Sequence, residues 1–101
     1  MTFIIQLQYE AVEDVQKIFM WYESKKIGLG YEFIESFEKT YTKLISSANY
    51  FDYIDKLKRY RRALLERFPC MVIYEIENNN VIIVAVRYSA ENPSKYEQFV
   101  R

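Results

Sequence analysis

The sequence predicts an α+β fold in the order β-α-α-β-β-β: an antiparallel meander sheet with an N-terminal strand, and an α-helical hairpin packed on one face. Three observations predict it. A strand-like alternation opens the chain, two long segments of helical periodicity follow, and short apolar runs separated by turn residues fill the last third. Two amphipathic helices need an apolar surface to cover, and the strands supply one. With 101 residues, the chain is expected to form a single domain over residues 1–101.

The first strand is expected over residues 2–8, where apolar and more polar side chains alternate. Helices are expected over residues 11–27 and 31–47, because apolar residues recur at intervals of three and four in both segments. Acidic residues open the first helix and lysines close it, as the helix dipole favours. Gly28 is expected to adopt the left-handed conformation that ends this helix, so that the two helices form an antiparallel hairpin.

Three further strands are expected over residues 60–65, 70–77 and 81–88. Asn78 and Asn79 separate the last two strands, and asparagine tolerates the positive φ that a tight hairpin turn requires. The last strand is the most apolar, so it is expected to be central in the sheet. The polar tail that follows it is expected to end in a short docked turn.

A net charge of zero conceals an uneven distribution of charge. Residues 1–55 carry five Lys/Arg against nine Asp/Glu, a net of −4, and residues 56–101 carry nine against five, a net of +4. This asymmetry indicates either an anionic partner for one face or attraction between the two halves within the fold. No segment has the roughly 18 apolar residues of a membrane span, and no signal peptide is recognisable. A cytoplasmic protein without membrane association is therefore expected.

The chain has no histidine and one cysteine. The lack of histidine excludes Ser-His-Asp triads, histidine-ligated zinc and histidine general bases. Cys70 lies in an apolar run, so it is interpreted as a small buried hydrophobic residue. The acidic residues show no metal-ligand spacing, and neither a metal nor a cofactor is expected.

Several short segments occur in an order and at spacings that are typical of one family of small proteins. They are Ala11-Val12-Glu13-Asp14-Val15, Trp21-Tyr22-Glu23, Gly28-Leu29-Gly30-Tyr31-Glu32-Phe33, Arg62 with Arg67-Phe68-Pro69 and Ile73-Tyr74, and Val84-Ala85-Val86 with Asn92-Pro93. Over nearly its whole length the chain resembles the RelE/ParE toxin superfamily, and the ParE-like (plasmid-stabilisation) branch most closely. The resemblance implies the toxin of a bacterial type II toxin–antitoxin pair, masked by a cognate antitoxin protein.

The resemblance implies two kinds of target. ParE-like members are reported to poison DNA gyrase, whereas RelE-like members cleave messenger RNA on the ribosome. RelE-like ribonucleases place an arginine near the position of Met71, and members are usually basic, whereas this chain is neutral. These departures favour a ParE-like toxin that inhibits DNA gyrase. The alternatives are a RelE-like ribosome-dependent mRNA endoribonuclease and a non-toxic antitoxin-binding module.

Metal-free RNA cleavage needs a base, a cation at the phosphorane and an acid. The catalytic candidates are Arg62, Arg87, Tyr88 and Tyr96. The candidates for binding a target or nucleic acid are Arg59, Arg61, Arg62, Arg87 and Lys95. Because the pKa of arginine is too high for a general base, these residues favour binding over catalysis. If the protein is an enzyme, it is expected to be a metal-independent endoribonuclease.

Each group of candidates has a structural alternative. Strand alternation predicts Arg59 and Arg61 on one face and Arg62 on the other, where they bind a target, pair with helix carboxylates such as Glu32 or Glu35, or solubilise a sheet edge. The charge of Arg87 at the end of an apolar strand must be exposed, paired or presented in a cleft. The antitoxin-binding candidates are Trp21, Tyr50, Phe51 and Tyr53, whose alternative is a half-buried core and rim.

Overall fold

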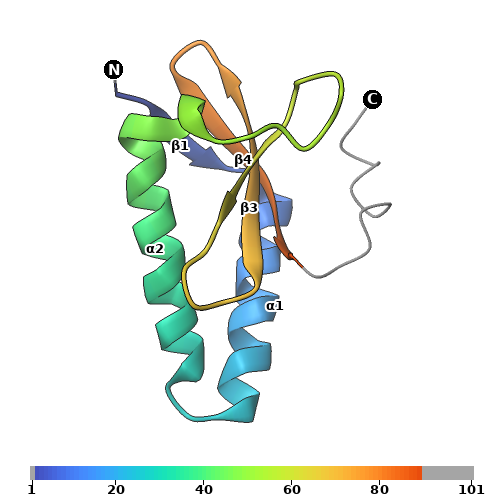
Figure 1. Ribbon diagram of the computed structural model, residues 1–101. Coiled ribbons are helices and arrows are strands. Elements are labelled where there is room, and N and C mark those ends of the chain that lie inside the picture. The colour runs from blue at the N-terminus through green and yellow to red at the C-terminus, as the bar shows by residue number, and fades with distance from the viewer. Residues whose placement is uncertain (1, 90–101) are drawn as a thin grey trace.

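The computed structural model describes residues 2–89 and confirms the α+β class and the predicted order of elements (Figure 1). The elements are β1 Ile4–Leu7, α1 Tyr9–Lys25, α2 Leu29–Ser47, the 3-10 turn η1 Ala48–Tyr50, β2 Arg61–Leu64, β3 Cys70–Glu77 and β4 Asn80–Tyr88. Both helices begin two residues earlier than expected, and α1 ends two residues earlier. The predicted final turn and the candidates Lys95 and Tyr96 lie outside the described residues.

The sheet has the order β1-β4-β3-β2, with β4 in the interior as predicted. Strands β2, β3 and β4 form the antiparallel meander, but β1 pairs in parallel with β4, so the sheet is mixed. The helical hairpin explains the parallel pair. It returns the chain to the end of the sheet where β1 began, and the N–H of Phe3 donates to the carbonyl of Ile45 near the end of α2 at 2.7 Å. Strand β2 therefore starts at the same end as β1.

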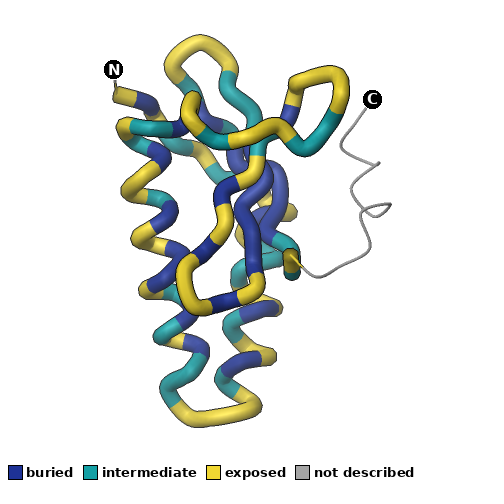
Figure 2. Tube along the Cα trace, viewed as in Figure 1, coloured by how far each residue is buried: buried dark blue, intermediate teal, exposed yellow. Residues whose placement is uncertain are grey.

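Both helices cover one face of the sheet, here called the helix face (Figure 1). Phe33 and Leu44 of α2 and Val72 and Tyr74 of β3 are fully buried there. The opposite face carries a smaller buried cluster of Tyr60, Met71, Ile73, Val84 and Ala85. Figure 2 shows burial concentrated on the strands and on the inward sides of the helices.

The junction between the helices depends on two glycines and one carboxylate. Gly28 has φ 91°, the predicted left-handed conformation. A Cβ atom on Gly30 would lie 2.8 Å from the ring and carbonyl of Phe19, so only glycine permits this approach of α1 and α2. The Glu23 carboxylate accepts the N–H groups of Gly28 and Gly30, both at 2.9 Å, and so caps the start of α2.

The hairpin between β3 and β4 turns at residues 78–79, and Asn78 has the expected positive φ of 59°. The aromatic connection after α2 departs from expectation. Tyr50 is 81% exposed, so the half-buried alternative is wrong for this residue, whereas Phe51 packs against the core. Within residues 2–89, no helix combines the length and apolar character needed to cross a membrane.

Candidate functional site

Arg61 holds the aromatic connection against the start of β2. Its guanidinium donates to the carbonyls of Asn49 at 3.2 Å and Phe51 at 2.7 Å, and to the Tyr53 hydroxyl at 2.7 Å. It also lies 4.0 Å from the centre of the Tyr53 ring, a cation–π distance. Its donors are therefore largely used within the fold.

Arg59 lies on the opposite face of the sheet, where its Nε is 3.1 Å from a Glu75 carboxylate oxygen. The expectation that Arg59 and Arg61 share a face is wrong. Strand β2 begins only at Arg61, and residues 55–60 form a turn in which the Asp55 carboxylate accepts the N–H of Arg59 at 3.2 Å and that of Tyr60 at 3.1 Å. Strand alternation does not extend into this turn.

The predicted pairing of these arginines with helix carboxylates does not occur. Glu32 is 2.7 Å from Arg67 instead, and Glu35 is 4.0 Å from Lys39. The Arg62 side chain is exposed and has no ion pair within residues 2–89. Among these arginines, Arg62 is thus the one left with its charge toward solvent.

Arg87 is paired, one of its three predicted alternatives. Its Nη1 donates to the Asp14 carboxylate of α1, and the same carboxylate oxygen accepts the N–H of Val86 at 3.0 Å. The reason is the short length of β1, whose pairing with β4 ends at a bond from Gln8 to the Ile83 carbonyl at 2.9 Å. Beyond that point α1 crosses the edge of β4, and Asp14 satisfies an N–H that no strand can reach.

A groove of about 440 Å³, here called the arginine groove, brings Arg59 and Arg87 together on the opposite face. Its lining residues are Gln8, Glu10, Arg59, Tyr60, Glu75, Val84 and Arg87. Val84 reaches it because the β3–β4 register shifts between Ile73 and Tyr74, which leaves an extra residue in β4. Two guanidinium groups and two carboxylates share the groove, so it is a mixed-charge site that presents hydrogen-bond donors and acceptors side by side.

Tyr88 and Trp21 lie on the other side of β4 from this groove. Tyr88 packs against the helix-face core, with its ring 6.3 Å from that of Trp21 and 6.5 Å from that of Tyr22. Strand alternation separates Tyr88 from its neighbour Arg87. The structure therefore does not place these two catalytic candidates in one site.

Three titratable side chains of the core have pKa values that are raised by burial. Burial raises the pKa of Cys70 from its ordinary value of 9.0 to about 11, so the thiol stays protonated. Burial, followed by the neighbouring Cys70, raises the pKa of Tyr22 to about 12. Burial also raises the pKa of Tyr74, whose hydroxyl donates to the Ala48 carbonyl at 2.5 Å. Residues 2–89 contain no group of three His, Cys, Asp or Glu side chains placed to hold a metal ion.

Met71 lies near the position at which the resemblance to RelE-like ribonucleases implies an arginine. It is 2% exposed on the opposite face and is the register partner of Arg87. An arginine there would therefore lie beside Arg87. In this chain the position contributes a buried thioether instead of a second cation.

A second groove, here called the helix groove, lies between α1 and α2. It has a volume of about 440 Å³ and is lined by Val15, Gln16, Phe19, Met20 and Ile34. Met20 is 67% exposed. Val15, Phe19 and Ile34 belong to the apolar stripes that predict the two helices, and periodicity cannot distinguish the buried side of such a stripe from its exposed margin. The aromatic candidates for antitoxin binding are divided between α1, which holds Trp21, and the connection after α2.

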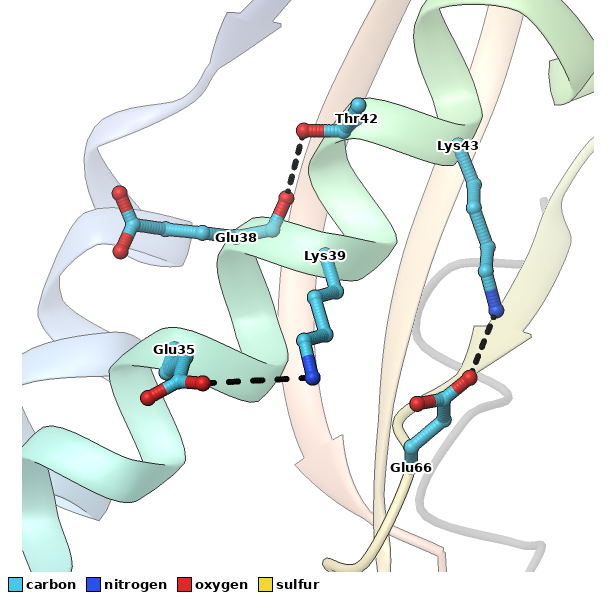
Figure 3. A pocket seen from close by; sticks show the side chains of 6 residues that line it. All are labelled: Glu35, Glu38, Lys39, Thr42, Lys43 and Glu66. Carbon is cyan, nitrogen blue, oxygen red and sulfur yellow. Dashed lines mark hydrogen bonds and ion pairs between the residues drawn. The ribbon is translucent and has the colours of Figure 1, made fainter.

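A shallow groove of about 460 Å³ on the outer side of α2 carries only ordinary surface charges (Figure 3). Its lining residues are Glu35, Glu38, Lys39, Thr42, Lys43 and Glu66. Lys43 is 3.1 Å from Glu66, and both side chains are more than half exposed. Such pairs contribute little to stability or to specific recognition.

Asp14 and Glu75 are site residues that sequence reasoning missed. In the sequence, Asp14 is one of the acidic residues that suit the start of the first helix, and Glu75 lies in a predicted strand with no role indicated. Their roles arise from contacts with Arg87, 73 positions along the chain, and with Arg59, 16 positions away. A single sequence carries no signal for such pairings.

No protein-family model matches the chain, and no curated protein matches its sequence. A solved structure described as the chromosomal ParDE TA system from P. aeruginosa contains a similar chain, with a TM-score of 0.73 and 17% identity. The similarity covers 86% of this chain and 96% of that chain. At this identity the match shows a common fold, and it supports the predicted ParE-like architecture.

Proposed function

We propose that this protein is the toxin component of a type II toxin–antitoxin module. The observation that carries the proposal is the common fold, which extends over 96% of a chain from a ParDE system. The sequence resemblance to the ParE-like branch supports the same assignment from the arrangement of segments along the chain. The fold alone does not identify a function, because one fold can host several functions. The agreement between the fold and the sequence resemblance therefore supports the assignment.

The proposed partner is a cognate antitoxin protein that covers apolar surface on the helical hairpin. The helix groove supports this, because exposed apolar side chains on a small protein are typical of a protein-binding surface. Trp21 adds a half-exposed aromatic ring to the same helix. Tyr50 and Tyr53 offer a second aromatic contact on the connection after α2.

The proposed mode of action is binding to a protein target, with DNA gyrase as the target that the family resemblance implies. In the arginine groove, Arg59 and Arg87 are each paired with a carboxylate. No histidine is available as a general base, and arginine is too basic for that role. A mixed-charge groove suits a polar protein surface better than a bare phosphate chain.

Inducible expression in bacteria tests the proposal. Growth should arrest on induction, DNA-damage signalling should rise, and cellular transcripts should remain intact. Co-expression of the cognate antitoxin should restore growth. Normal growth at confirmed soluble expression would reject a toxin and leave the non-toxic antitoxin-binding module as the assignment.

The presence of Arg59 and Arg87 in one groove favours a second candidate, a ribosome-dependent mRNA endoribonuclease of the RelE type. Two guanidinium groups near each other could stabilise a phosphorane. Primer extension on cellular mRNA would then show cuts that disappear in Arg87→Ala. Growth arrest with uncut transcripts rejects this candidate.

A further inference from the structure

The outer edge of β1 carries backbone groups that bond to nothing in the described part of the chain. Ile4 and Gln8 donate toward β4, to the carbonyls of Asn79 at 2.8 Å and Ile83 at 2.9 Å. Because successive residues of a strand bond to opposite sides, the N–H and C=O groups of Ile5 and Leu7 point away from β4. Strand β1 is at the outside of the sheet (Figure 1), so these four groups face outward.

This edge lacks the usual protection against pairing with another strand. Residues 2–9 contain no charged side chain, and Ile4 is 62% exposed. Natural sheets normally protect an exposed edge with lysines, prolines, bulges or a covering segment. Phe3 is held at one end of the edge by its bond to Ile45, which leaves Ile5 and Leu7 as the open positions.

The other edge of the sheet, β2, is protected in those ways. Both edge strands are four residues long, but β2 begins with two arginines, whereas β1 carries no charge. The outward N–H of Arg62 donates to the Asp52 carbonyl at 3.0 Å, and residue 53 forms a bridge with Arg61. One edge of the sheet is therefore charged and partly covered, and the other is uncharged and open. This contrast identifies β1 as the edge available for strand pairing.

We propose that β1 pairs with β1 of a second copy of this chain, in antiparallel orientation, to form one continuous sheet through a two-fold symmetric dimer. With Gln6 on the two-fold axis, Ile5 of each strand is opposite Leu7 of the partner copy's strand. Since Ile5 and Leu7 are the residues whose backbone groups point outward, this register satisfies all four groups of each edge reciprocally.

A second copy fits this edge better than a charged partner strand does. The edge offers no charge to attract an acidic or basic segment, and an uncharged strand meets its own copy without like-charge repulsion. The partly exposed sides of Ile5 and Leu7 lie on the helix face. In the dimer each would be covered by its counterpart, while the exposed Gln6 amides meet across the axis.

Charge substitution at Gln6 tests the proposal, because this side chain is exposed and forms no hydrogen bond or ion pair with another side chain within residues 2–89. Paired residues of this type have Cα atoms about 4.5 Å apart. Gln6→Lys and Gln6→Glu should therefore each weaken the dimer by about tenfold or more through like-charge repulsion. An equimolar mixture of the two variants should restore dimers, because the two side chains that meet at position 6 then have opposite charges.

Sedimentation equilibrium of the full chain at micromolar concentrations measures the association, with circular dichroism to confirm folding. Leu64→Lys, an exposed position on the β2 edge, is the matched control and should leave the dimer intact. Amide hydrogen exchange of the wild type provides an independent measurement: Ile5 and Leu7 should exchange more slowly as the protein concentration rises.

The proposal is overturned by a wild-type monomer throughout this range, or by a dimer that Gln6→Lys leaves unchanged and Leu64→Lys disrupts. It is also overturned if Ile5 and Leu7 exchange at a rate independent of concentration. Strand pairing that occurs only after an antitoxin is added would assign the edge to that partner instead. Since none of these measurements uses toxicity, they are independent of the growth assay for the proposed function.

Discussion

The two faces of the sheet are built by different chemistry. The helix face is covered by two helices and holds fully buried aromatic and aliphatic side chains, including Phe33, Leu44 and Tyr74. The opposite face has a smaller apolar cluster, bordered by the ion pairs of Arg59 with Glu75 and of Arg87 with Asp14. Because the helix face buries more apolar side chains, we expect it to contribute most of the stability, whereas the opposite face combines a smaller core with charged groups.

Removing a large side chain from the helix face should have the largest effect on the free energy of unfolding. Phe33→Ala should lower the free energy of unfolding by about 3–5 kcal/mol, because it leaves a cavity between α2 and the sheet. Val84→Ala on the opposite face should cost only about 1–2 kcal/mol. Urea unfolding measures both values. Because Val84→Ala removes fewer carbon atoms, equal losses would show that the opposite face contributes more per buried atom than the helix face.

The Asp14 carboxylate connects the helices to the charged side of the molecule. Asp14→Ala should cost about 2–3 kcal/mol, because it removes the acceptor of both the Val86 N–H and the Arg87 guanidinium. Asp14→Asn keeps an oxygen that can accept the backbone bond, so about half of the loss should return. Thermal unfolding distinguishes them. If Asn and Ala destabilise equally, the backbone bond contributes nothing.

Alkaline pH should lower the free energy of unfolding through the buried Cys70. Because burial raises the pKa of Cys70 from 9.0 to about 11, the unfolded chain loses its thiol proton first. The stabilising contribution is therefore complete below pH 9.0 and falls between 9.0 and about 11. Cys70→Ala should have a shallower decline of unfolding free energy across that window, measured by urea unfolding at several pH values. Parallel curves for variant and wild type would contradict it.

The surface ion pair of the arginine groove should matter least for stability. Arg59→Gln should lower the free energy of unfolding much less than Asp14→Ala does, because the Arg59 side chain is half exposed to solvent. Urea unfolding beside the wild type provides the measurement. A larger loss would show that Arg59 stabilises the fold and does not serve only as part of a binding surface.

Local sequence patterns were sufficient to predict most of the fold. Alternation, helical periodicity, Gly28 and the asparagine turn each act over a few residues, and the structure confirms the elements that they predict. The parallel pairing of β1 was missed, because it depends on where the helical hairpin returns the chain. The arginines of the site were found by type, but their carboxylate partners Asp14 and Glu75 were not, because those contacts form only in three dimensions.

We propose that this protein is a toxin whose charged opposite face meets its target. Growth after induction of Arg87→Gln tests it most directly, beside wild type and Arg67→Gln, a matched control whose ion pair with Glu32 lies outside the arginine groove. With equal soluble protein, wild type and Arg67→Gln should arrest growth, whereas Arg87→Gln should allow growth close to that of uninduced cells. Normal growth with the wild type, or equal arrest by both variants, would contradict the claim.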